Sequence, residues 1–224
     1  MRYKAIFLDY YGTLAAEDDA IIDRIVRRIA DVSPVDCSPE DVLRNWRFHH
    51  LCDMAHGENF KPQRQIEEES LAALLELYRV DLDPAELSAE LWQYWRAPQV
   101  FEDAGWFLRH IDAPTCVVSN IDTEDLERAM SNAGWAFDYV VTSEMCRAYK
   151  PRQQVFARAL TAAGCQPDEV LHVGDSLRID VAGAQNVGID AAWINRKRRK
   201  LPPGTPAPCF ECVDLRQLLG RLTR

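Results

Sequence analysis

The sequence of 224 residues lacks any long apolar run, which is the first constraint on its class. Stretches such as Ala5-Ile6-Phe7-Leu8 end after a few residues at a charged side chain, whereas a membrane span needs about 20 apolar residues. Asp9 falls where a secretory signal would carry its apolar region, so no export signal is predicted. We therefore expect a protein without membrane partners.

The sequence also lacks an excess of positive charge. Lys and Arg total 26 against 35 Asp and Glu, giving a net charge of −9, which disfavours nucleic acid and anionic lipid as general partners. The seven cysteines are odd in number, and the C-x-x-C of Cys209 and Cys212 has no second pair at a zinc-site spacing. These features disfavour a disulfide framework and predict a reducing, cytoplasmic location.

Hydrophobic residues make up 47% and charged residues 27%, as in a globular chain of one large domain or one and a half. Residues 18–95 carry helical periodicity without a convincing strand: Ile21, Ile25 and Ile29 recur at i, i+4 and i+8. The periodic segments that follow predict three more helices. We expect a four-helix cap over residues 16–99, inserted after the first strand.

Short apolar runs and helices alternate after Phe101, which indicates a parallel sheet with helical crossovers. The strands expected from these runs are Tyr3 to Asp9, Thr115 to Ser119, Tyr139 to Thr142, Val170 to Val173 and Ala191 to Ile194. The fold class predicted is α/β, with a Rossmann-like three-layer core formed by residues 1–15 and 100–224.

Polar side chains follow the expected strands where each strand ends. Asp9, Ser119-Asn120 and Asp175 end three of these strands, and Lys150 lies in the loop after another. Ligands of an open parallel sheet bind outside the carboxyl ends of its strands, so these side chains predict one site.

These residues form four ordered motifs that resemble those of the haloacid dehalogenase (HAD) superfamily. The motifs are Asp9-Tyr10-Tyr11-Gly12-Thr13-Leu14, Ser119-Asn120, Lys150-Pro151, and Gly174-Asp175 with Asp180. The resemblance spans the core from Tyr3 to about Ile194, and the helical insert resembles the small cap of that superfamily.

The resemblance implies a hydrolase in which Asp9 is the nucleophile of a covalent intermediate, a device that divides one difficult displacement into two steps. It implies that Lys150 orients Asp9, that Asp180 belongs to the acidic motif of the catalytic machinery, and that Thr13, Ser119 and Asn120 bind the transferred group. In phosphatase members, Mg²⁺ would be held by Asp9, Asp175 and the main-chain carbonyl of Tyr11.

Two positions favour different reactions. The phosphatases carry an aspartate where this chain has Tyr11, and a phenol of pKa about 10 donates a proton but is a poor base. The D-x-Y-G-T motif instead resembles the 2-haloacid dehalogenase branch, in which halide needs no proton and an arginine like Arg47 contacts halide or substrate carboxylate. Asp175 favours metal, because two carboxylates about 4 Å apart repel by about 4 kcal/mol at an effective dielectric of about 20.

We favour Mg²⁺-dependent hydrolysis of a small phosphorylated metabolite. The alternatives are 2-haloacid dehalogenation without a metal, and a catalytically impaired member that binds a ligand or partner. The expected partner is a small anionic metabolite, and the chain is a monomer or a homodimer. We interpret the basic run over residues 196–200 as a solvated turn.

Overall fold

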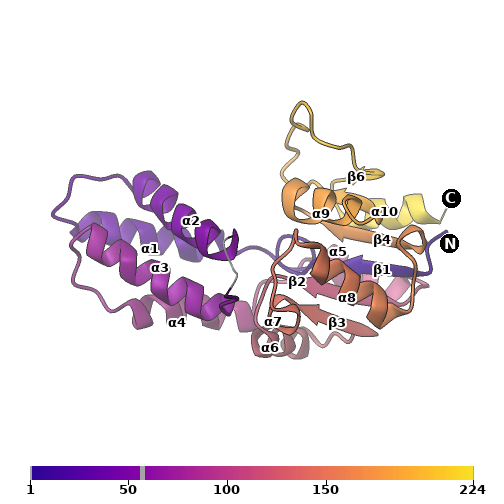
Figure 1. The fold of residues 1–224 in the computed structure, drawn as a ribbon, viewed down its shortest axis with the longest axis horizontal. Coiled ribbons are helices and arrows are strands. Elements are labelled where there is room, and N and C mark those ends of the chain that lie inside the picture. Colours follow the sequence, from indigo (N-terminus) through magenta and orange to yellow (C-terminus); the bar gives the residue numbers. More distant parts are fainter. Residues whose placement is uncertain (1, 56–58, 224) are drawn as a thin grey trace. The chain divides into compact units, whose positions relative to one another are not determined.

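The computed structural model describes residues 2–55 and 59–223 (Figure 1). They form two compact units. The sheet unit comprises Met1–Glu17, Gln99–Asn120 and Ala133–Arg224, and the helical unit comprises Asp18–Pro98 and Ile121–Asn132.

A six-stranded parallel sheet forms the centre of the sheet unit, in the order β3-β2-β1-β4-β5-β6. Its strands are β1 (Ala5–Leu8), β2 (Thr115–Ser119), β3 (Tyr139–Thr142), β4 (Val170–Gly174), β5 (Asp190–Ile194) and β6 (Phe210–Cys212). The predicted α/β class with a parallel sheet is confirmed. The edge strand β6 was not predicted, because three residues with a charged one in the middle give no apolar run.

The central strands are buried along their whole length, since helices cover both faces of a parallel sheet. On one face, Ala5 and Phe7 share a buried cluster with Val155 and Phe156 of α8. The helices of this unit are α5 (Glu102–His110), α7 (Ser143–Cys146), α8 (Gln153–Ala163), α9 (Ala182–Gln185) and α10 (Leu215–Leu222), with a 3₁₀ turn η1 (Pro167–Glu169) and a wide turn η2 (Leu177–Val181).

The helical unit contains α1 (Asp19–Val32), α2 (Pro39–Ala55), α3 (Gln63–Leu77) and α4 (Pro84–Arg96), so four helices form in the predicted insert. Local signals set their starts. Asp83 accepts a hydrogen bond from the Ala85 amide at 2.9 Å, and Pro84 occupies the first turn of α4. Among the described residues, no helix is both long and apolar enough to cross a bilayer.

Helix α6 (Thr123–Ala133) groups with the helical unit apart from its last residue, although its sequence alternates with the strands of the core. Asp122 accepts hydrogen bonds from the backbone amides of Gln63 at 2.7 Å and Arg64 at 3.0 Å, and so caps α3. The buried carboxylate of Asp125 pairs with Arg64 and, at 2.9 Å, with Arg96. The division into 16–99 and the remaining core stays a prediction about folding domains.

Burial in α3 gives a test of the helical unit. Leu74 is fully buried and Leu77 is 50% exposed on the same helix. Leu74→Ala should lower the free energy of unfolding by about 2–5 kcal/mol, because it opens a cavity in packed surroundings. The measurement is urea unfolding followed by circular dichroism. Leu77→Ala is the control, and equal losses in the two variants would contradict this packing.

Candidate active site

Asp9 follows β1 directly, at the carboxyl edge of the sheet. Its backbone amide donates to the Val173 carbonyl at 2.9 Å, so the sheet ladder fixes its position. The side chain is nearly buried, at 7% exposure. The Thr13 hydroxyl donates to Asp9 Oδ2 at 3.1 Å. A carboxylate held at both its backbone and its side chain is suited to attack in one direction.

The Lys150 ammonium lies between two carboxylates. Its Nζ donates to Asp9 Oδ1 and to Asp180 Oδ1, each at 2.7 Å, and all three side chains are buried. The loop that carries Lys150 is held by Asn120. The Asn120 side chain accepts from the Lys150 amide at 2.7 Å and donates to the Lys150 carbonyl at 3.1 Å. The amide predicted to bind substrate is therefore also a support for the lysine.

The charges in this cluster control one another. Burial raises the pKa of Asp9 to about 6, against the attraction of Lys150. Burial also opposes ionisation of Asp180, but Lys150 and a hydrogen bond from His172 outweigh it and hold its pKa below the usual range. Burial disfavours the Lys150 ammonium as well, and the two carboxylates outweigh that effect and raise its pKa. Asp180 is thus the more acidic of the two carboxyls, and Asp9 is the one that takes up a proton more readily.

His172 was not recognised in the sequence, because a single polar residue inside an apolar strand gives no pattern. It lies on β4, fully buried, with Nε2 at 3.1 Å from Asp180 Oδ1. Burial lowers its pKa. A neutral imidazole with its proton on Nε2 donates to Asp180, so it helps to hold the carboxylate that faces Lys150.

Asp175 follows β4 and completes a group of three carboxylates. One oxygen from each of Asp9, Asp175 and Asp180 lies within 4.8 Å of the others. Burial and the neighbouring Asp9 and Asp180 raise the pKa of Asp175 to about 8. Gly12 makes room for it: φ there is +89°, and a Cβ would lie 2.7 Å from Asp175 Cγ. Three oxygen ligands this close suit a hard divalent cation.

The carboxylate group borders a cavity of about 240 Å³ at the carboxyl edge of the sheet. Predicted residues line it together with residues that the sequence did not single out: Asp9, Tyr11, Glu17, Ser119, Asn120, Lys150, Asp175, Ser176, Ile179, Asp180 and Arg199. Thr13 is fully buried and contacts Asp9 through its hydroxyl. Arg47 is an exposed residue of α2 in the helical unit, and its contact with substrate stays a prediction.

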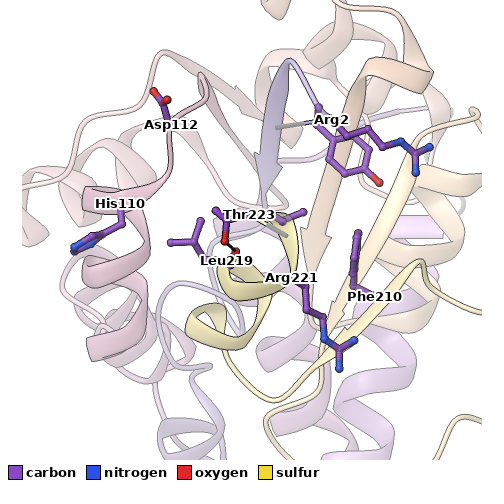
Figure 2. Close-up of a pocket in the computed structure, with 9 residues that line it drawn as sticks. Arg2, His110, Asp112, Phe210, Leu219, Arg221 and Thr223 are labelled. Atoms are coloured by element: carbon purple, nitrogen blue, oxygen red, sulfur yellow. Dashed lines mark hydrogen bonds between the residues drawn. The ribbon is translucent and has the colours of Figure 1, made fainter.

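A larger cavity of about 620 Å³ lies near the amino end of β1, beside α10. Its polar side chains do not converge: in Figure 2, Arg2, His110 and Arg221 extend in three different directions. A ligand site needs a few polar groups aimed at one place. The smaller cavity has that property and is therefore the candidate site.

Residues 197–200 of the basic run are exposed, as expected for a solvated turn, but Arg196 is half-buried. Arg196 pairs with Asp103 at 2.9 Å, donates to the Thr13 carbonyl at 2.8 Å and stacks over the Phe101 ring at 3.8 Å. Arg199 reaches the cavity itself. Composition alone could not show the Arg196 contacts, because they come from residues 93 or more positions away in the sequence.

A parallel sheet with a buried lysine–carboxylate cluster at its carboxyl edge is an arrangement typical of α/β enzymes. The model of the haloacid dehalogenase-like hydrolases matches residues 3–188, and the chain belongs to this hydrolase family.

The similar proteins include two kinds of hydrolase. The (S)-2-haloacid dehalogenase H-109 of Pseudomonas putida is 27% identical over 107 residues, 47% of each chain. The pyrimidine 5'-nucleotidase YjjG of Escherichia coli is 38% identical over 84 residues, 37% of this chain and 36% of that protein. These matches span about half or less of the relatives' length.

A solved structure of L-2-haloacid dehalogenase from Xanthobacter autotrophicus, with chloropropionic acid covalently bound, superposes with a TM-score of 0.77. It is 22% identical and covers 99% of this chain and 98% of that one. At that identity the likeness supports the fold.

Removing the buried ammonium tests the charge cluster. Lys150→Met should lower the free energy of unfolding by about 3–5 kcal/mol, because it leaves two buried carboxylates without their cation. Lys197→Met is the matched control. Lys197 lies 60% exposed beside Glu17, where an ion pair contributes about 1 kcal/mol or less. Urea unfolding at neutral pH compares the two, and similar small losses would contradict the assignment.

Proposed function

We propose that this protein is a cytoplasmic, Mg²⁺-dependent hydrolase of a small phosphorylated metabolite, with Asp9 carrying the phosphoryl group between two half-reactions. The observation that carries the proposal is Asp175, which lies within 4.8 Å of both Asp9 and Asp180. Lys150 supplies one positive charge to the three carboxylates and contacts two of them, Asp9 and Asp180. A second cation would stabilise the negative charge of the remaining one, Asp175. The similarity to a nucleotidase supports phosphate as the transferred group.

The donors around Asp9 fit magnesium. They are oxygen atoms, and the cavity lining described above includes four carboxylates, Lys150 and Arg199, so its formal charge with every group ionised is −2. Asp9, Asp175 and the Tyr11 carbonyl would hold the ion, since Asp180 is already engaged by Lys150 and His172. A bound Mg²⁺ would shield the negative charge on the phosphoryl oxygens.

The chain's own residues carry out two displacements. In the first displacement, a carboxylate oxygen of Asp9 forms a bond to phosphorus while the ester P–O bond breaks. The electron pair of the broken P–O bond stays with the ester oxygen, which is the leaving group. Lys150 and Thr13 orient the carboxylate, and Ser119 donates to the phosphoryl oxygens. The Tyr11 phenol gives a proton to the leaving oxygen. In the second, water attacks phosphorus, the P–O bond to Asp9 breaks with its electron pair returning to the carboxylate, and a proton of the water passes to the Tyr11 phenolate, which releases phosphate and restores the phenol.

Tyr11 restricts the substrate. A phenol of pKa about 10 is a much weaker proton donor than a carboxylic acid, so this site favours esters whose leaving group needs little protonation, such as acyl phosphates. The same residue favours a second candidate, hydrolysis of a carbon–halogen bond by Asp9, which the similarity to a haloacid dehalogenase supports. In that reaction Arg47 would contact the substrate carboxylate.

Magnesium separates the two candidates. The protein should hydrolyse members of a phosphate-ester panel with Mg²⁺ and leave 2-chloropropionate intact, and Asp9→Asn should abolish turnover. Calorimetry should detect Mg²⁺ binding that Asp175→Asn weakens at least tenfold. Asp168→Asn is the control, because it removes the same negative charge from an exposed position. Chloride release without Mg²⁺, together with no binding at millimolar Mg²⁺, would establish the second candidate instead.

Exchanging the phenol tests its role. Tyr11→Asp should raise turnover of an ester with a poor leaving group, such as ethyl phosphate, by a factor in the range of about 10²–10⁴ that general acid–base catalysis supplies. Steady-state kinetics measures the turnover. Tyr11→Asn is the control, because asparagine has the shape of aspartate but cannot transfer a proton. Loss of all activity in Tyr11→Asp would show that the phenol performs chemistry of its own.

A further inference from the structure

The basic run places one cation at the mouth of the candidate site. Arg199 lines the cavity that Asp9 and Lys150 border, and its side chain is 50% exposed. Its Nη2 donates to the Asp175 carbonyl at 2.8 Å, while the Asp175 carboxylate lies 3.6 Å away, beyond a strong hydrogen bond. The guanidinium therefore keeps most of its donors for another acceptor.

The surroundings hold this arginine in position. Asn195, buried directly after β5, accepts from the Arg199 amide and donates to the Arg199 carbonyl, both at 2.8 Å. The guanidinium lies over the Trp193 ring at 5.7 Å, and the Trp193 indole donates to the same Asp175 carbonyl at 2.8 Å. Such fixation lowers the conformational entropy lost when a ligand binds.

Arg199 pairs with one carboxylate of the cavity lining, that of Asp175, at the long N···O distance of 3.6 Å. Glu17, a carboxylate of the same lining, has the Lys197 ammonium at 3.2 Å. Lys150 is shared by two carboxylates at the floor of the cavity. Asp175, the nearest acid to Arg199, belongs to the three-carboxylate group.

We propose that Arg199 is a specificity-determining residue that binds a carboxylate of the substrate, next to the group transferred to Asp9. A planar guanidinium fork matches a carboxylate in geometry and charge. A cavity of about 240 Å³ admits a short molecule, below the usual range of ligand pockets. The substrate class is thus a short phosphate monoester with a carboxylate close to the ester bond. This inference rests on the proposed phosphatase function.

A matched pair of esters tests it. Phosphoglycolate and ethyl phosphate differ in the carboxylate, and kcat/KM is measured for both with saturating Mg²⁺. The wild type should prefer phosphoglycolate, and Arg199→Gln should reduce that preference about ten- to a hundredfold, mostly through KM, as expected for a charge-assisted contact. Arg199→Lys should retain part of the preference. Arg198→Gln, which removes the same charge from the neighbouring exposed position, should leave the preference unchanged.

The outcomes are distinguishable. A wild type that hydrolyses both esters without preference, or an Arg199→Gln variant that loses the same factor on both, overturns the role of Arg199 and leaves the phosphatase function standing. An equal loss accompanied by weaker Mg²⁺ binding in calorimetry would identify Arg199 as a support of Asp175 instead. A wild type that hydrolyses an acyl phosphate such as acetyl phosphate but neither of these esters overturns the role of Arg199 alone, and one that hydrolyses none of the three overturns both proposals.

Discussion

The rest of the site depends on the placement of one ammonium group out of contact with water. A buried lysine is stable when carboxylates compensate it, and Lys150 has two, each at 2.7 Å. The structure meets this requirement from several directions. Asn120 holds the lysine backbone, His172 holds Asp180, and Gly174 lets Asp180 approach, since a Cβ there would lie 2.3 Å from Asp180 Cγ.

This arrangement gives two aspartate carboxyls, those of Asp9 and Asp180, different pKa values. Asp180 receives Lys150 and His172 and stays ionised, whereas Asp9 shares Lys150 and is raised in pKa by burial. The environment thus shifts the pKa values of two carboxyls at one edge in opposite directions, the pattern by which a site assigns different roles to groups of one type. The carboxyl ends of neighbouring parallel strands bring both to one edge, although they lie far apart in the sequence.

The sequence predicted those features that short patterns determine. Apolar runs located β1 to β5, and acids or a lysine after the strands pointed to the edge where Asp9, Lys150 and Asp175 meet. Other features arise from contacts that no local pattern encodes. The strand β6 is too short for periodicity, α6 is held by Asp122 and Asp125 against distant arginines, and the basic run is ordered by Asn195 and Asp103.

The glycine at position 12 has a consequence for how such a site changes its chemistry. Any side chain there would meet both a positive φ and the Asp175 carboxyl, so that position is closed to variation while Asp175 remains. Position 11 borders the cavity without that restriction. A mutant library aimed at new reactivity should therefore randomise residue 11 and spare residue 12, since a new side chain at residue 11 does not require the loop to be rebuilt.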